Sequence, residues 1–147
     1  MSRLVPYMPS NIKNVRSVFK EMGLNSEDIF YDLGCGDGRI ISLAVNEFNV
    51  KKAVGIEIRP NLIDPAVYEK NNIEIRIEDL NGSDFTDATV IYTYLTDVYM
   101  LRLRRKLSLL KGVTIVSCWF PVEGWIPDDV FKFRNDMFYI YRIGGQK

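Results

Sequence analysis

The sequence predicts an α/β domain: a seven-stranded mixed sheet with helices on both faces and one reversed strand near the C-terminus. Two observations lead to this prediction. Short apolar runs typical of strands alternate with segments of helical periodicity along most of the chain, as in a parallel sheet covered on both sides. About ten residues then separate the fifth predicted strand from the sixth, which leaves little room for a crossover helix.

Glycine and proline separate the periodic segments in the first half of the chain. Apolar residues at helical spacing end at Gly23, two continuous apolar runs end at Gly34 and Pro60, and Pro65 allows only a short helix afterwards. A later segment alternates apolar and charged residues, which is typical of a strand with one solvated face. The predicted elements are helices at 11–22 and 39–48, strands at 29–33, 53–58 and 73–77, and a short helix within 61–70.

Residue type is the main guide in the second half. Runs of β-branched and aromatic residues predict strands, and the tail offers two short ones that we expect to be antiparallel. Between the fourth and fifth strands, apolar residues recur at helical spacing, with Arg102, Arg105 and Lys106 predicted to face outward. The predicted elements are strands at 89–95, 113–118, 130–134 and 138–143, and a helix at 98–110.

Composition and charge narrow the class of protein. The 147 residues suffice for one domain, expected over 1–147, and 19 basic and 19 acidic residues give a formal net charge of zero. This balance argues against a dedicated nucleic-acid-binding protein. We expect no membrane span and no signal peptide, and therefore a cytoplasmic protein with both cysteines reduced. The absence of histidine removes the commonest general base, and we predict no metal site.

The stretch YDLGCGDGR, residues 31–39, places three glycines between a predicted strand and a predicted helix. Such a turn aims backbone N–H groups at one point and lets a ligand approach the main chain. A tight turn without a ligand would need one glycine. A nicotinamide dinucleotide site would have the pattern G-x-G-x-x-G, and Asp37 would repel its pyrophosphate. S-adenosylmethionine fits better, because its positive sulfonium and amino groups would favour Asp32 and Asp37.

This stretch closely resembles the first motif of class I S-adenosylmethionine-dependent methyltransferases, which have a Rossmann-like fold. The resemblance implies S-adenosylmethionine as cofactor, with Asp32, Gly34 and Gly36 in its binding site. An acidic residue for the ribose hydroxyls is expected about 20 residues further on. Glu57 lies there, 19 residues after Gly38.

Three further residues are predicted around the adenine. Ile58, directly after Glu57, would pack on the ring. Asp79 lies where a carboxylate accepts a hydrogen bond from the adenine amino group in the family, and the N–H of Leu80 would reach the ring.

Four segments narrow the resemblance to the small archaeal protein-lysine methyltransferases and their mitochondrial relatives that modify a subunit of the ATP synthase. By this resemblance, Tyr7 and Ser10 would close over the methionine end of the cofactor. Two features depart from the family: the region after Glu57 is shorter and interrupted by proline, and Cys118-Trp119 replaces His-Glu. The four segments are VPYMPS, DLGCGDGR, FNVKKAVGIEI and SCWFPVEGW.

The acceptor pocket is expected where the fourth and fifth strands end. Methyl transfer from a sulfonium is a direct displacement, so positioning of the acceptor contributes most of the catalysis. Tyr94, Trp119 and Phe120 are the candidate catalytic residues, because aromatic walls can hold an alkylammonium by cation–π contact. The resemblance makes a protein lysine side chain the expected acceptor.

Other activities remain open. The chain could methylate RNA or a small molecule, since the predicted helix 98–110 is rich in arginine and lysine, although such a face is more often simply solvated. It could also be a catalytically silent subunit that binds the cofactor and stabilises a partner. No D/N-P-P-Y/F motif follows the fourth strand and no Pro-Cys pair occurs, which argues against adenine or glutamine and cytosine-5 methylation.

Overall fold

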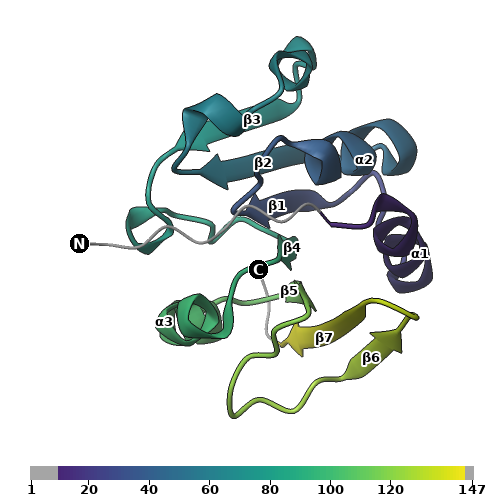
Figure 1. Cartoon of the computed structure of the whole chain (residues 1–147), viewed down its shortest axis with the longest axis vertical. Helices are drawn as coiled ribbons and strands as arrows, with labels where there is room; N and C mark the ends of the chain where they lie inside the picture. Colours follow the sequence, from purple (N-terminus) through teal and green to yellow (C-terminus); the bar gives the residue numbers. More distant parts are fainter. Residues whose placement is uncertain (1–9, 145–147) are drawn as a thin grey trace.

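In the computed structural model, which describes residues 10–144, seven strands form one sheet in the order β3-β2-β1-β4-β5-β7-β6 (Figure 1). The first five strands pair in parallel, and β7 runs antiparallel to both β5 and β6, which confirms the predicted fold class. The strands are β1 (Ile29–Leu33), β2 (Lys52–Glu57), β3 (Ile73–Ile77), β4 (Val90–Thr93), β5 (Val113–Cys118), β6 (Asp129–Lys132) and β7 (Met137–Ile143).

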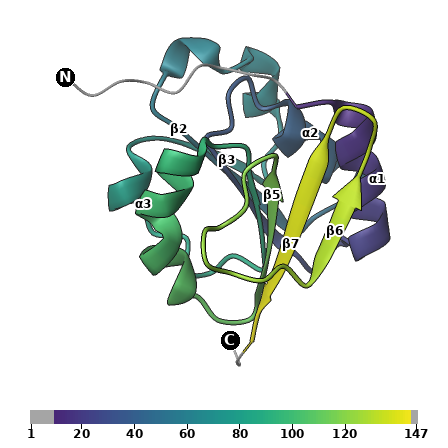
Figure 2. The same cartoon turned by 60° about the horizontal axis from the view of Figure 1, so that its bottom comes forward.

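Three helices cover the sheet: α1 (Ile12–Met22), α2 (Arg39–Phe48) and α3 (Asp97–Ser108). Helices α1 and α2 pack on one face and α3 on the other, as the edge-on view shows (Figure 2). Each face has its own apolar cluster, with Phe19 and Phe30 at the centre of the first and Ile91 and Leu103 at the centre of the second. None of the helices in residues 10–144 is long and apolar enough to cross a membrane.

The connection from β2 to β3 forms two short 3₁₀ turns, η1 (Pro60–Leu62) and η2 (Pro65–Glu69), where a short helix was predicted. A proline begins each turn, and neither turn extends into an α-helix. Val67 of η2 packs directly over Gly38, where a Cβ would lie 2.6 Å from the valine methyl. The connection can cover the glycine-rich turn after β1 only because residue 38 has no side chain.

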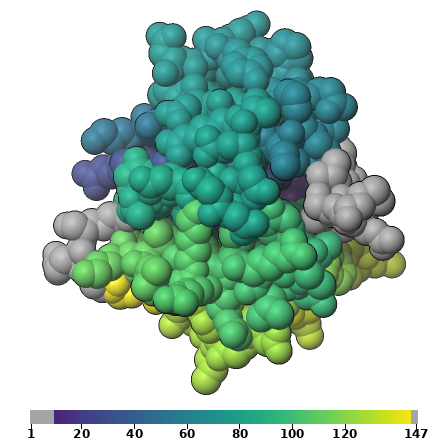
Figure 3. Space-filling view, turned by 90° about the vertical axis from the view of Figure 1, so that its left-hand side faces the viewer, coloured from purple at the N-terminus to yellow at the C-terminus, as the bar shows by residue number. Residues whose placement is uncertain are grey.

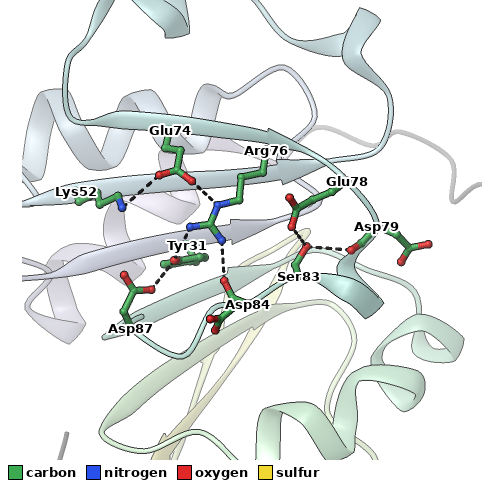
Figure 4. A network of polar contacts seen from close by, with 9 residues as sticks. All are labelled: Tyr31, Lys52, Glu74, Arg76, Glu78, Asp79, Ser83, Asp84 and Asp87. Atoms are coloured by element: carbon green, nitrogen blue, oxygen red, sulfur yellow. Dashed lines mark hydrogen bonds and ion pairs between the residues drawn. The ribbon is translucent and has the colours of Figure 1, made fainter.

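A polar network, in place of a helix, holds the connection from β3 to β4 (Figure 4). Arg76 on β3 pairs with Glu74, donates to the carbonyl of Asp84 at 2.7 Å and donates to the hydroxyl of Tyr31 at 3.2 Å. Tyr31 in turn donates to Asp87 at 2.5 Å. These bonds tie the second half of the connecting loop, after the turn η3 (Leu80–Gly82), to the sheet.

Lys106 also fixes this loop, and the prediction that it faces outward is wrong. Its ammonium donates to the carbonyls of Leu80 at 3.1 Å and Asn81 at 3.3 Å and to that of Ser83, and it lies 4.7 Å from the ring centre of Phe85. A short turn leaves its last carbonyls without backbone partners, and a lysine is well suited to satisfy them. In the space-filling view, the loop and α3 accordingly form one continuous surface (Figure 3).

We expect Gly55→Ala to destabilise the protein by about 1–3 kcal/mol, because overpacking a filled interior costs that much. A Cβ at position 55 would lie 2.7 Å from the sulfur of Cys35 and 3.0 Å from Ile75. Gly82→Ala is the matched control, since nothing lies within 4 Å of a Cβ there. Urea denaturation measures both, and equal effects of the two substitutions would contradict this packing argument.

Candidate active site

All three glycines of residues 31–39 adopt left-handed backbone conformations. The φ angles of Gly34, Gly36 and Gly38 are 82°, 58° and 91°. Any other L-residue would pay about 1–2 kcal/mol at each of these positions, a total comparable to a large part of a domain's stability. The amides of Gly34 and Cys35 both donate to the carbonyl of Ile56, at 2.8 and 3.0 Å. The glycines therefore allow the chain to leave β1, bend against the end of β2 and enter α2.

Glu57 at the end of β2 anchors this turn. It is 3% exposed, and its Oε1 accepts the amide of Gly36 at 2.9 Å. Its Oε2 accepts the backbone N–H and the Nε of Arg59, at 3.1 and 3.2 Å. Since a carboxylate offers about four acceptor positions, roughly one is left for a ribose hydroxyl unless Arg59 moves. The sequence placed Glu57 at the ribose, but it did not reveal that the same side chain holds the glycine turn.

Asp32 is the carboxylate best suited to a cationic ligand. It is 2% exposed, and within residues 10–144 no hydrogen bond or ion pair reaches its side chain. Burial, and then the negative charges of Glu57 and Asp37, raise the pKa of Asp32 well above its usual value. Asp37 and Glu57 both pair with arginines, so Asp32 is the member of this acidic group that lacks a cation within the described chain. A positively charged ligand group beside it would restore its charged form.

The predicted adenine residues lie at the ends of β2 and β3. Ile58 is 47% exposed, which leaves its side chain available to a flat ring. Asp79 caps η3 by accepting the amide of Asn81 at 2.9 Å, and Leu80 is buried beneath it. The sequence did not single out Tyr99 of α3, whose hydroxyl lies 3.5 Å from Asp79. Its position beside the inward-facing apolar residues of this helix was the available signal.

Ser10 lies where the N-terminal segment reaches the sheet. Its hydroxyl and that of Tyr92 on β4 are 2.5 Å apart, and both residues are buried. Burial raises the pKa of Tyr92, so this hydroxyl stays protonated. The bond places Ser10 at the carboxyl end of the parallel strands. Tyr7, the other residue predicted there, lies outside the described residues.

Two of the three predicted acceptor residues face each other. The rings of Tyr94, after β4, and Phe120, after β5, lie 6.4 Å apart at 32° to one another. Trp119 is 42% exposed, and its indole N–H donates to Asp136 at 2.8 Å, in the turn between β6 and β7. All four residues lie at the edge where the parallel strands end. The sequence indicated the three aromatics but not Asp136.

The backbone at Trp119 is strained. Its φ is 69°, and the amide of Phe120 donates to the carbonyl of Cys118 at 2.8 Å, which defines a γ-turn. The hydroxyl of Ser117 donates to the carbonyl of Phe120 and the amide of Trp119 donates to that of Met137, so the turn is held on both sides. A strained non-glycine residue at the end of a parallel strand is typical of a functional site.

Neither cysteine is suited to act as a nucleophile. Both are buried, and burial raises the pKa of Cys118 to about 12 and that of Cys35 higher still. The thiolate, which is the reactive form, is therefore scarce at neutral pH. Across residues 10–144, no group of three or more cysteine, aspartate or glutamate side chains is arranged to hold a metal ion.

Comparison with known proteins relates this chain to methyltransferases. Residues 32–129 match the family model described as the ANTKMT methyltransferase domain. The chain is 41% identical to a protein-lysine N-methyltransferase of Saccharolobus islandicus, over 97% of this chain and 96% of the relative. It is 27% identical to the adenine nucleotide translocase lysine N-methyltransferase of Mus musculus, over 96% of this chain and 64% of that one. A lysine N-methyltransferase of Xenopus laevis, named for a subunit of the ATP synthase, is 28% identical over 95% of this chain and 64% of its own.

A solved structure is similar to this chain in both fold and sequence. An RNA methyltransferase from Salinibacter ruber, crystallised with S-adenosylhomocysteine, superposes with a TM-score of 0.87 at 30% identity, covering 95% of this chain and 96% of that one. Fold and site thus define a Rossmann-like methyltransferase that depends on S-adenosylmethionine. More narrowly, the chain belongs to the ANTKMT methyltransferase domain family, as its sequence predicted.

The residues present fit this cofactor. Asp32 offers a carboxylate without a protein partner in the described chain, and the glycine turn leaves its backbone open to close approach. Glu57, Ile58 and Asp79 would hold the ribose and the adenine, and Asp32 the positively charged methionine end. When bound, S-adenosylmethionine supplies the methyl group from its sulfonium.

We expect Glu57→Ala to weaken binding of S-adenosylhomocysteine by roughly 2–4 kcal/mol, because hydrogen bonds to a charged group contribute about 1.5–3 kcal/mol each. The substitution also frees the amide of Gly36. Glu57→Gln keeps an acceptor for that amide and should lose less. Calorimetric titration measures both, and unchanged affinity in Glu57→Ala would remove this residue from the site.

Trp119→Gly should be more stable than Trp119→Ala by about 1 kcal/mol, because glycine adopts a φ of 69° without strain. Both variants lose the bond to Asp136, so their difference isolates the backbone. Thermal or urea unfolding gives the comparison. If alanine were the more stable of the two, as is usual outside left-handed positions, the γ-turn would not be strained.

Proposed function

We propose that this methyltransferase transfers methyl groups to the side chains of protein lysines. The observation that carries the proposal is the 41% identity, over nearly the whole of both chains, to a protein-lysine N-methyltransferase. The geometry of the acceptor side supports it. Tyr94 and Phe120 form an aromatic pair at the strand ends, with the half-exposed Trp119 beside them. Aromatic faces of this kind attract alkylammonium groups.

The chain's residues supply position and environment in this reaction. A lysine must lose its proton before it can accept a methyl group, which costs roughly 4.6 kcal/mol at pH 7 from an unperturbed pKa of about 10.4. Desolvation within the site lowers that cost, because it disfavours the charged amine, and a neighbouring positive sulfonium would act in the same direction. Tyr94 is no base at neutral pH, since burial, followed by Cys118 and Asp136, raises its pKa. Alignment of the lysine amine with the methyl group, between the glycine turn and the aromatic pair, then contributes most of the rate enhancement.

RNA is the second candidate acceptor, because the Salinibacter ruber protein with 30% identity is an RNA methyltransferase. The basic residues of α3 give this candidate less support than the sequence suggested. Arg104 donates to the carbonyl of Glu123 at 3.0 Å, and Lys106 holds the loop after β3. Arg102 and Arg105 are exposed on this helix. Two residues of the predicted basic face therefore have roles within the protein itself.

The purified chain is incubated with tritiated S-adenosylmethionine and a cell extract. We expect the label to enter protein, so that protease treatment removes the labelled material and ribonuclease treatment does not. Mass spectrometry should then find methylated lysine. Trp119→Ala should lower the rate strongly with nearly unchanged affinity for S-adenosylhomocysteine, because it removes an acceptor wall. Gly144→Ala serves as the active control, because it follows the end of β7 that pairs with the start of β5 and nothing lies within 4 Å of a Cβ there. Label found in RNA alone would favour the second candidate, and no label in either would favour a silent cofactor-binding subunit.

A further inference from the structure

The turn between β6 and β7 brings a carboxylate to the acceptor side of the site. The amide of Phe133 donates to the carbonyl of Asp136 at 2.8 Å and closes the turn, which lies beside α1 (Figure 2). Phe138 pairs with Cys118 in the antiparallel register, and Trp119 bonds to Met137. Asp136 therefore lies level with the end of β5, at the same edge of the sheet as the aromatic pair.

Both bonds to the side chain of Asp136 come from uncharged groups. Its Oδ1 accepts the indole N–H of Trp119 at 2.8 Å, and its Oδ2 accepts the side-chain amide of Asn14, on α1, at 2.5 Å. Each oxygen retains an acceptor position, because a carboxylate offers about four. Asp136 is half-buried, and no lysine or arginine of residues 10–144 forms an ion pair with it.

Two buried or half-buried carboxylates near the site have no ion-pair partner in the described chain. Asp37 and Glu57 have arginine partners, while Asp32 and Asp136 have none in the described chain. Asp32 lies on β1, directly before the glycine turn and on the cofactor side, and Asp136 lies level with the end of β5, on the acceptor side. The proposed reaction brings together a sulfonium cofactor and a lysine, and each side of the site has a carboxylate without an ion-pair partner in the described chain.

We propose that Asp136 and Trp119 form a subsite that recognises the positively charged end of the acceptor, an alkylammonium or its methylated forms. The inference rests on the proposed lysine substrate and names the group that selects it. An aromatic face joined to a carboxylate binds alkylammonium ions by cation–π and ionic attraction together. Asn14 keeps the carboxylate in place, and the bond from Trp119 fixes the indole plane beside it.

The alternative is that Asp136 only clips the β6–β7 turn to Trp119 and α1. Asp136→Asn separates the two roles. An asparagine still accepts the indole N–H, and Asn14 can turn its amide to face the new side chain, so the clip survives while the charge is lost. Asn14→Ala is the matched control, because it removes one bond of the clip and keeps the charge.

Two bisubstrate probes test the charge without any knowledge of the natural substrate. Both are analogues of S-adenosylhomocysteine with an arm at the sulfur position, ending in a trimethylammonium group in one and in its neutral isostere, tert-butyl, in the other. Wild-type protein should bind the charged probe about tenfold more tightly than the neutral one. Asp136→Asn should reduce that preference to about twofold or less, with unchanged affinity for the neutral probe and for S-adenosylhomocysteine. Asn14→Ala should retain the preference.

The outcomes are distinct. If Asp136→Asn keeps the full preference for the charged probe, or weakens all three ligands equally, the subsite is overturned and the clip is its role. If Asp136→Asn weakens S-adenosylmethionine but not S-adenosylhomocysteine, the carboxylate serves the cofactor and the proposal also fails. A wild-type chain that methylates lysine without preferring the charged probe overturns only the subsite. Label in RNA alone, in the experiment above, overturns the proposed function.

Discussion

The hydrogen bond from the amide of Gly36 to the buried carboxylate of Glu57 joins the turn after β1 to the end of β2, and the cofactor side is arranged around it. The bond can form only because three glycines let the chain bend back with positive φ angles. It is strong because a charged acceptor shielded from water meets a backbone donor. The start of α2 and the cover provided by Val67 both follow from the position that this bond gives the turn.

The predicted cofactor residues and the predicted acceptor residues lie on different parts of the sheet. The residues predicted to bind the cofactor lie on or directly after the strands β1, β2 and β3, and Arg76 and Lys106 fix the loop after β3. The strands β4, β5 and β7 carry the aromatic pair, the γ-turn and Asp136. Since β1 and β4 are neighbours, the two parts meet at the middle of the sheet, where the methyl group must pass.

Much of the fold could be predicted because its signals are local. The elements β1, α2, β3 and β5 have the predicted bounds, since each is a continuous apolar or periodic run and the first three are followed by a glycine or a polar residue. The strand predicted at 89–95 ends at Thr93, because the residues beyond it turn toward the acceptor side.

The site could be predicted only in part. The glycine turn and Glu57 could be proposed as site residues because their spacing along the chain is fixed by one βαβ unit. The roles of Lys106 and Asp136 could not be found in this way. Each depends on a contact between segments far apart in the sequence, and an isolated charged residue on a helix or in a turn looks the same whether it is solvated or bonded.

The position of β7 has a consequence for how the protein is made. This strand is the last of the sheet to be synthesised, yet it lies between β5 and β6. Until it has left the ribosome, β6 has no place in the sheet and β5 presents an unpaired edge, the kind of surface that promotes aggregation. A nascent chain can thus assemble strands β1 to β4 early, while the acceptor side with Asp136 is completed only once β7 has emerged. Termination before β7 would yield a molecule with an open sheet and no complete acceptor side.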